Sequence, residues 1–277
     1  MDNESNNTHL EGAVPALYDF CASFLLLFLR GFARDIHYRM KRPLETNAVL
    51  AELAHIRDDD HVLDAGCGQG STTLFLAENY NARIDAITIS KKECHIVSRR
   101  VQKAGYADRV AVFEENMLAT HFTKETFTVV IAIESMCHVG DKLAFLKEAH
   151  RTMEKGGRLL LADFFLTDAY DPNHDRGMYQ RFCEGFLVPT LTTKEDFENM
   201  LREVGFQDVR YHDYTEAISV TAQRREALGW MNAVILSPLL LLKLMPRMLV
   251  SNIHATIAQG KLFRHNKLSY GVIYAEK

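Results

Sequence analysis

The segment 61–70, which reads His-Val-Leu-Asp-Ala-Gly-Cys-Gly-Gln-Gly, constrains the fold more than any other part of this chain. A short apolar run reaches Asp64, and three glycines follow at alternate positions, Gly66, Gly68 and Gly70. An amphipathic pattern begins directly after them. A buried strand, a glycine turn and a helix start form a ligand cradle, because glycine lets the backbone approach a ligand and a helix start presents free N–H groups. The spacing differs from the Gly-x-Gly-x-x-Gly of dinucleotide sites, which disfavours a dinucleotide.

The rest of the chain alternates between strand and helix patterns. Strands are predicted at 61–65, 83–89, 109–113, 127–133, 158–165, 209–214 and 269–275, and helices at 14–32, 44–56, 71–80, 91–104, 141–154 and 193–204. Thr192 and Glu195 have the spacing of a capping box before the last of these helices, and Gly205 ends it. Short apolar strands separated by helices predict an α/β fold with a mostly parallel, doubly wound sheet.

One domain is expected over residues 13–277, after a disordered leader at 1–12. A long insertion at 216–266 separates the last two strands and contains Trp230 and an apolar run at 233–242. Together with residues 14–56, it is predicted to form a helical lid over the mouth of the sheet. Ordinary core helices, a homo-oligomer surface and peripheral membrane contact are the alternatives, although the apolar runs lack the basic face of interfacial helices.

Composition and charge narrow the functional class. The net charge of −4 over 277 residues gives no reason to expect a nucleic-acid partner. Five cysteines lie far apart without paired spacing, which disfavours zinc or a disulfide framework, predicts no metal site and suits the cytoplasm. No secretory signal is visible, and the apolar run at 20–29 is too short to be an integral membrane segment.

The acid followed by alternating glycines resembles motif I of the class I S-adenosylmethionine-dependent methyltransferases. The resemblance implies a Rossmann-like seven-stranded sheet with an antiparallel last strand, and S-adenosyl-L-methionine as the cofactor. It assigns cofactor contacts to Asp64, Gly66 and Gly68, and to Thr88 and Ile89 at the end of the second strand. Glu93 is expected to accept hydrogen bonds from the ribose. A solvated acid in the first helical turn is the alternative for Glu93, and Asp85 is the weaker ribose candidate.

The adenine position of the family falls on Asn116 and Met117, after the third strand. The amide of Asn116 suits the N6 edge of adenine, and Met117 supplies an apolar contact with the ring. The family more often has Asp where this chain has Asn116.

Two later segments resemble the sterol C-methyltransferases. They are Ala-Ile-Glu-Ser-Met-Cys-His-Val at 132–139 and Thr-Asp-Ala-Tyr-Asp-Pro-Asn at 167–173, and Ile-His-Tyr at 36–38 is similar to their aromatic entry segment. The resemblance implies carbon methylation of a lipophilic isoprenoid or terpenoid acceptor, sterol-like or a prenyl diphosphate, with cation-driven cyclisation as an option. Cys137 occupies the position where cyclopropane-forming relatives have Glu, which argues against cyclopropanation. The entry segment lacks the tryptophans of the sterol enzymes, and this chain is shorter.

Methylation of an alkene leaves a carbocation that a base must finally deprotonate. His138 is the leading base, with Asp163 or Glu134 as its partner, because the ends of parallel strands are where α/β active sites form. Each residue also has a purely structural alternative. Glu134 can simply hydrogen-bond to the backbone or to the cofactor amine. His138 can be a turn residue whose ring is hydrogen-bonded within the protein. Aromatic side chains can stabilise the cation, and Tyr38 is the first candidate. The full set can equally belong to the core: Tyr18, Tyr38, Tyr179 and Trp230.

The acceptor is the most open question. A basic set, Arg30, Arg34, Arg39, Lys41, Arg42, Arg176 and Arg181, suits a diphosphate, but a solvated helix face explains the same residues. Oxygen or nitrogen methylation of a lipophilic natural product is the alternative activity. A non-catalytic binding module is a third reading, which the intact glycines and Glu93 disfavour.

Overall fold

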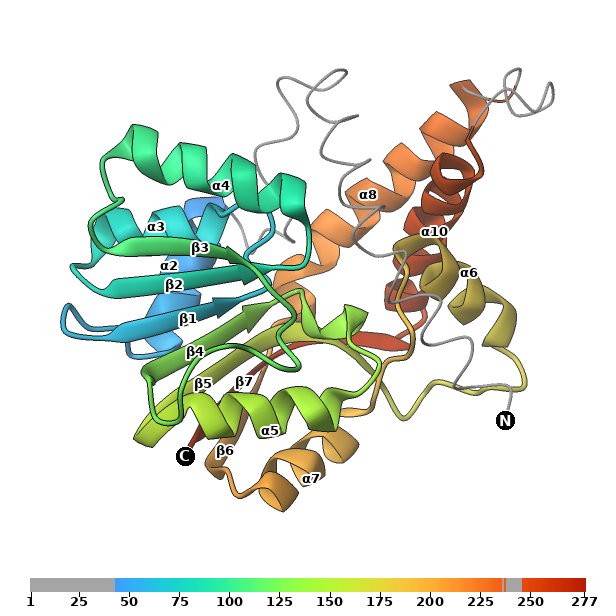
Figure 1. The fold of residues 1–277 in the computed structure, drawn as a ribbon. Coiled ribbons are helices and arrows are strands. Elements are labelled where there is room, and N and C mark those ends of the chain that lie inside the picture. Colours follow the sequence, from blue (N-terminus) through green and yellow to red (C-terminus); the bar gives the residue numbers. More distant parts are fainter. Residues whose placement is uncertain (1–42, 236, 238–245) are drawn as a thin grey trace.

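The computed structural model describes residues 43–235, 237 and 246–277. Seven strands form one sheet in the order β3-β2-β1-β4-β5-β7-β6, and helices cover both of its faces (Figure 1). All strand pairs are parallel except those of β7, which runs antiparallel to both β5 and β6. The predicted Rossmann-like, doubly wound sheet with an antiparallel last strand is confirmed.

The first half of the sheet follows the predicted alternation closely. Its elements are α2 (Pro43–Leu53), β1 (His61–Ala65), α3 (Ser71–Asn79), β2 (Arg83–Thr88), α4 (Lys91–Ala104), β3 (Val110–Glu114) and β4 (Phe127–Ile133). Ser90 caps α4 by accepting a hydrogen bond from the Glu93 N–H, and Gly105 ends the helix in a left-handed conformation. The prediction at 44–56 runs too far, because α2 ends at Leu53 and His55 has a positive φ of 50°.

The second half contains a helix that the sequence patterns did not predict. Its elements are η1 (Met136–His138), α5 (Lys142–Thr152), β5 (Met153–Leu166), α6 (Arg176–Phe186), α7 (Lys194–Val204), β6 (Gln207–Asp213), α8 (Thr215–Ile235), α10 (Arg247–Arg264) and β7 (Leu268–Glu276). The missed helix is α6, although Met178, Phe182 and Phe186 already have helical spacing there. The capping box lies one residue later than predicted, because Thr193 accepts from the Asp196 N–H.

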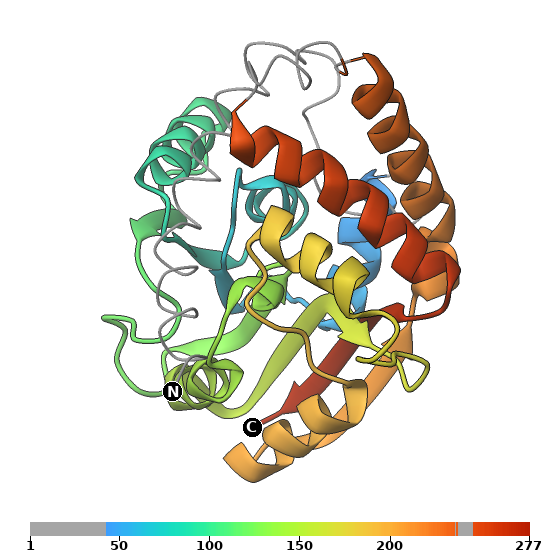
Figure 2. The ribbon, with the colours of Figure 1, turned by 90° about the vertical axis from the view of Figure 1, so that its right-hand side faces the viewer.

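Two groups of buried side chains form the core, one on each face of the sheet. Phe127, Phe145 and Phe197 belong to the group under α5 and α7, and Leu50, Leu76 and Val97 to the group under α2, α3 and α4. The second group continues into α6, α8 and α10, which lie beyond the ends at which β1–β4 point (Figures 1 and 2). Ligand sites in α/β sheets form at this edge. The helices α6, α8 and α10 are therefore placed to cover such a site.

The N-terminal part of the predicted lid lies largely outside the described residues. That part includes the leader at 1–12, the helix predicted at 14–32, the entry segment at 36–38 and Tyr38. In the described ranges, no helix combines the length and apolarity that crossing a bilayer requires.

Candidate functional site

The glycine segment forms a tight loop between β1 and α3. Gly66, Gly68 and Gly70 all have positive φ values, 90°, 51° and 78°. The N–H groups of Gly66 and Cys67 both donate to the Ile87 carbonyl, at 3.0 and 2.9 Å, which fastens the loop to the end of β2. Residues that carry a Cβ rarely adopt a positive φ. Three positive values in one short loop therefore call for glycine.

The three glycines differ in what surrounds them. A Cβ on Gly66 would lie 2.5 Å from the Ser135 Cβ, and one on Gly70 would lie 2.6 Å from a Val97 methyl carbon. A Cβ on Gly68 would have none of the described atoms within 4 Å. Packing therefore explains Gly66 and Gly70, whereas Gly68 borders open space, as a backbone that approaches a ligand must.

Asp64 lies beneath the loop and is 2% exposed. Its Oδ2 accepts a 2.6 Å hydrogen bond from the Thr73 hydroxyl of α3. One oxygen of the predicted cofactor-binding carboxylate thus joins strand to helix, which fixes the entry angle of α3 behind the glycine loop.

The end of β2 orders the predicted ribose residues around one buried carboxylate. Glu93 is only 3% exposed, and its Oε2 accepts a 3.0 Å hydrogen bond from the Thr88 hydroxyl. Thr88 Oγ1 also accepts from the Ser90 N–H, and Ile89 between them is 37% exposed. The reading of Glu93 as a solvated surface acid is therefore wrong, and its carboxylate is held at the edge of the sheet beside β1.

The adenine-position residues follow β3. Asn116 is exposed, and its Oδ1 accepts from the Leu118 N–H at 3.0 Å, so this oxygen stabilises the local turn. Met117 reaches back to the glycine loop, since its Cε would lie 3.1 Å from a Cβ on Gly66. The structure brings Met117, Ser135 and Gly66 together. The other ribose candidate, Asp85, is engaged elsewhere, because its Oδ2 lies 2.7 Å from His61 Nε2 in mid-strand.

Asp163 holds the turn after β4 in place. Its Oδ1 and Oδ2 accept 2.8 Å hydrogen bonds from the N–H groups of Phe164 and Cys137. Burial raises the pKa of Asp163 to about 6, although both of these backbone donors act to lower it. Asp163 therefore anchors η1 to β5 one residue before His138.

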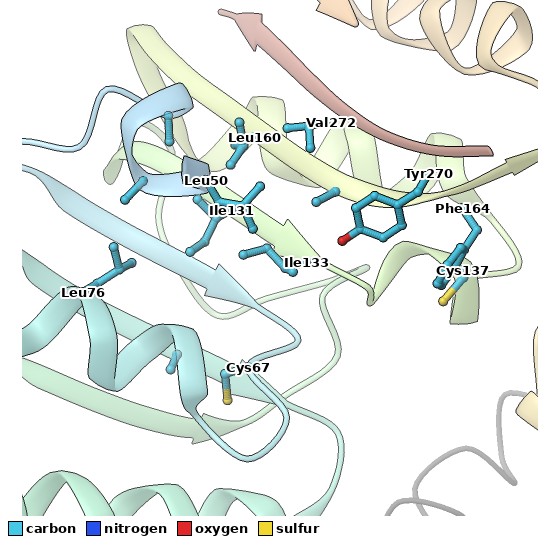
Figure 3. Packing of buried hydrophobic residues seen from close by; sticks show 14 of the residues in the cluster. Leu50, Cys67, Leu76, Ile131, Ile133, Cys137, Leu160, Phe164, Tyr270 and Val272 are labelled. Atoms are coloured by element: carbon cyan, nitrogen blue, oxygen red, sulfur yellow. The ribbon is translucent and has the colours of Figure 1, made fainter. Parts of the chain in front are cut away.

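Glu134 ends β4 with a positive φ of 50°, and its N–H donates to the Ala162 carbonyl of β5 at 2.7 Å. Its Oε1 accepts a 3.1 Å hydrogen bond from the Tyr270 hydroxyl. Figure 3 shows the Tyr270 ring, which comes from β7, near Ile133 at the end of β4. Burial is the largest cause that raises the pKa of Tyr270 well above its ordinary value, and the charge of Glu134 adds to it, so Tyr270 stays a proton donor to Glu134.

His138 ends η1 and joins it to the connection between α6 and α7. Its Nδ1 lies 3.3 Å from the Leu187 carbonyl oxygen. A carbonyl only accepts, so Nδ1 carries the proton and the lone pair of a neutral ring lies on Nε2. Burial lowers the pKa of His138, against the opposing effects of the Leu187 hydrogen bond and the Glu134 charge. The partner of Nδ1 is therefore a backbone carbonyl and not the predicted carboxylate of Asp163 or Glu134.

The same connection is fastened by residues that the sequence patterns did not single out. Lys142 donates to the carbonyls of Val139 and Thr190, at 2.8 and 2.9 Å, and burial lowers its pKa. Tyr179 accepts from the Leu191 N–H at 2.8 Å. Ser135, which donates to the Ala65 carbonyl, and Tyr270 were also missed, because both act through contacts between strands that are distant in sequence.

The remaining predicted residues are the candidate aromatic and basic side chains. Trp230 is 49% exposed on α8 with the Lys261 ammonium 5.2 Å from its ring centre, whereas Tyr179 lies against Tyr170 and Phe182. Arg176 and Arg181 are exposed on α6, and the other basic residues of the proposed diphosphate set, with Tyr18 and Tyr38, lie outside the described ranges. The part of the chain that the structure describes contains no group of three acidic, His or Cys side chains arranged to hold a metal ion.

Comparisons with known proteins agree with this geometry. A family model described as a methyltransferase domain matches residues 62–157. An O-methyltransferase from Aspergillus sclerotiorum is 30% identical over 213 residues, which are 74% of this chain and 80% of that protein.

Solved structures show the same fold. A candidate sarcosine dimethylglycine methyltransferase from Galdieria sulphuraria has a TM-score of 0.75 at 18% identity, and the match covers 94% of this chain and 98% of that one. A geranyl diphosphate C-methyltransferase from Streptomyces coelicolor has a TM-score of 0.66 at 17% identity, covering 84% and 75%.

Proposed function

We propose that this chain, which belongs to the S-adenosylmethionine-dependent methyltransferases, methylates a hydroxyl oxygen of a lipophilic small molecule. The observation that carries the proposal is the tautomer and the lowered pKa of His138. Methylation of a hydroxyl requires the loss of its proton, and His138 combines a lowered pKa with an Nδ1–H tied to Leu187. The O-methyltransferase from Aspergillus sclerotiorum supports oxygen as the acceptor atom.

The loop and the strand ends fit the cofactor that the family uses. Gly68 borders the open space that the cofactor would occupy. Asp64 and Gly66 hold the loop that carries Gly68 in place. Glu93, ordered by Thr88 and flanked by Ile89, supplies a carboxylate for vicinal hydroxyls. Asn116 and Met117 supply an amide and an apolar contact for the purine. When bound, S-adenosylmethionine supplies an electrophilic methyl group whose transfer depends mainly on positioning and exclusion of water.

His138 is the base in this proposal. A neutral imidazole with its lone pair on Nε2 accepts the hydroxyl proton, and the Leu187 carbonyl holds the ring in that tautomer. Asp163 and Glu134 act as positioning residues. Asp163 fixes the peptide before His138, and the Glu134 charge favours the imidazolium that forms.

Aromatic side chains at the edge of the sheet that α6, α8 and α10 cover support a lipophilic acceptor. Phe164 at the end of β5 lies 5.3 Å from Tyr270, 6.0 Å from Phe263 and 6.5 Å from Phe182, as distances between ring centres. Aromatic walls of this kind bind apolar molecules with few polar contacts. We therefore propose that the described helices of the 216–266 insertion, α8 and α10, act as a lid over this edge.

Carbon methylation of an isoprenoid is the second candidate. The segments at 132–139 and 167–173, with their resemblance to sterol C-methyltransferases, favour it. In that reaction His138 removes a proton from a carbocation instead of a hydroxyl.

Transfer of an isotopically labelled methyl group distinguishes the two reactions. The protein is incubated with methyl-labelled S-adenosylmethionine and 1-naphthol, farnesol or geranyl diphosphate, the last with and without Mg²⁺, and products are identified by mass spectrometry and NMR. A label on oxygen supports the proposal, and a label on carbon supports the second candidate instead. If none of the three compounds is methylated, the assignment of a lipophilic alcohol, phenol or prenyl acceptor is contradicted. The Gly68→Val variant, expected not to bind the cofactor, is the control for label carried over without catalysis.

A further inference from the structure

Gln259 is a buried amide in the middle of α10 that the structure leaves with an unused hydrogen-bonding atom. Its side chain is 3% exposed, and Oε1 has no hydrogen-bond partner among the described residues. The other buried atom of this kind is Oδ1 of Asp85, whose carboxylate is already paired through Oδ2 with His61. A buried polar atom without a partner costs about 1–3 kcal/mol, so it needs an explanation.

Helical spacing places Gln259 on the same face of α10 as Phe263. Asn252, Thr256, Gln259 and Phe263 recur along α10 at intervals of four, three and four residues, and they share one face of the helix. Phe263 contacts Phe164 at the end of β5, which fixes this face as the inward one. His254 and His265, on other faces of α10, are exposed.

The two flanks of α10 are occupied by other helices. Gly185 of α6 lies against Ser251 and Ala255, and Gly260 of α10 lies against Glu226 of α8. Between these flanks, the inward face looks onto the region where Phe164 packs against Tyr270. Figure 2 shows α10 crossing in front of this edge of the sheet. Gln259 is therefore turned toward the same edge that carries His138 and Glu134.

The neighbouring polar side chains of this face are satisfied within the protein. Thr256 Oγ1 donates to the Asn252 carbonyl at 2.8 Å, and Asn252 Nδ2 donates to the Gly185 carbonyl at 3.4 Å. The Oε1 of Gln259 differs from them. If the amide oxygen and nitrogen of Gln259 are exchanged, the same end of the amide is still unpaired, now as a donor.

We propose that Gln259 binds a second hydroxyl group of the acceptor, other than the one that is methylated, and thereby sets which lipophilic molecules are methylated. The proposal rests on the function proposed above, since it places the acceptor under α10. A polar contact among aromatic side chains is selective, because a buried amide that a ligand satisfies favours a hydroxylated molecule over its apolar isostere.

The test compares two probes of the same shape, 1,6-dihydroxynaphthalene and 6-methyl-1-naphthol, which both keep a hydroxyl for His138 and differ only in the second group. Their dissociation constants are measured by calorimetry on the full chain saturated with S-adenosylhomocysteine. The wild type should bind 1,6-dihydroxynaphthalene about fivefold more tightly, the scale of one net hydrogen bond. In Gln259→Met, which keeps the length of the side chain, the ratio should fall to about one.

Thr256→Val is the matched control, because it removes a hydroxyl from the same face that is already used inside the helix. It should leave the fivefold ratio unchanged. The melting temperature of Gln259→Met should not fall below that of the wild type, because no protein contact of Oε1 is lost. A wild type that does not discriminate between the probes, or a Gln259→Met variant that keeps the ratio, overturns the proposal. The same holds for a variant that melts several degrees lower, because Gln259 would then have a structural partner.

The two proposals fail in different ways. If 1,6-dihydroxynaphthalene binds with the expected ratio but no alcohol or phenol is methylated on oxygen, the assigned reaction is wrong and the role of Gln259 in binding stands. If O-methylated product forms but Gln259→Met keeps the wild-type ratio, the reaction stands and the role of Gln259 is refuted.

Discussion

Substitutions at Gly68 and Gly70 should separate the packing of the glycine loop from its binding of the cofactor. Both residues have positive φ, so a side chain at either position costs about 1–2 kcal/mol of strain. At Gly70 a Cβ also meets a methyl group of buried Val97 at 2.6 Å, and relief of such overpacking costs about 1–3 kcal/mol more. At Gly68 no described atom is close enough to add a second cost.

Gly70→Ala should therefore lose about 2–5 kcal/mol of stability yet still bind S-adenosylmethionine when folded. Gly68→Val should lose about 1–2 kcal/mol, because strain is its only cost, and should bind no cofactor. For a domain of this size, each kcal/mol lowers the melting temperature by about 2–4 °C. Scanning calorimetry measures the stability, and titration calorimetry well below both melting temperatures measures cofactor affinity.

The double variant Gly70→Ala, Val97→Ala tests the steric part of the argument. Removing the Val97 methyl groups makes room for the new Cβ, so the two changes should be less destabilising together than the sum of the single effects. Strict additivity would show that Val97 is not the obstacle. Wild-type cofactor affinity in Gly68→Val would refute the assignment of the open side of Gly68 to the ligand.

Three further results are expected. His138→Ala should lower kcat by about 10²–10⁴-fold with unchanged cofactor affinity, and the identity of the product should stay the same for a hydroxyl acceptor but diversify into other alkenes or alcohols for a carbocation; a near-normal rate removes His138 from the mechanism. Glu93→Ala should weaken S-adenosylmethionine binding by about 1–3 kcal/mol in titration calorimetry, and an unchanged dissociation constant contradicts the ribose role. The pKa of Asp163 in the folded protein, about 6, exceeds the ordinary 3.8, so its contribution to stability is complete at low pH and is lost as pH rises through 6. The stability advantage of the wild type over Asp163→Asn in urea unfolding should therefore shrink by about 2–3 kcal/mol between about pH 4 and 7, and a constant difference contradicts the raised pKa.

Local patterns along the chain were enough to predict part of this structure. The run into Asp64 and the alternating glycines act over a few residues, so β1 and the loop were predictable. The alternation of strands and helices predicted the doubly wound sheet for the same reason. Family resemblance added the cofactor and the candidate residues from Thr88 to Met117.

The contacts of those residues depend on how distant parts of the chain pack together. Glu93 has the sequence position of an exposed helix acid, yet packing against Thr88 buries it. His138 takes its partner from Leu187 in a distant connection, and Glu134 takes its own from Tyr270 in β7. These contacts are set by the order of strands in the sheet, which brings the ends of β4, β5 and β7 together. The unpaired amide of Gln259 likewise has no local sequence signal, because burial without a partner is a property of packed helices and not of a pattern along the chain.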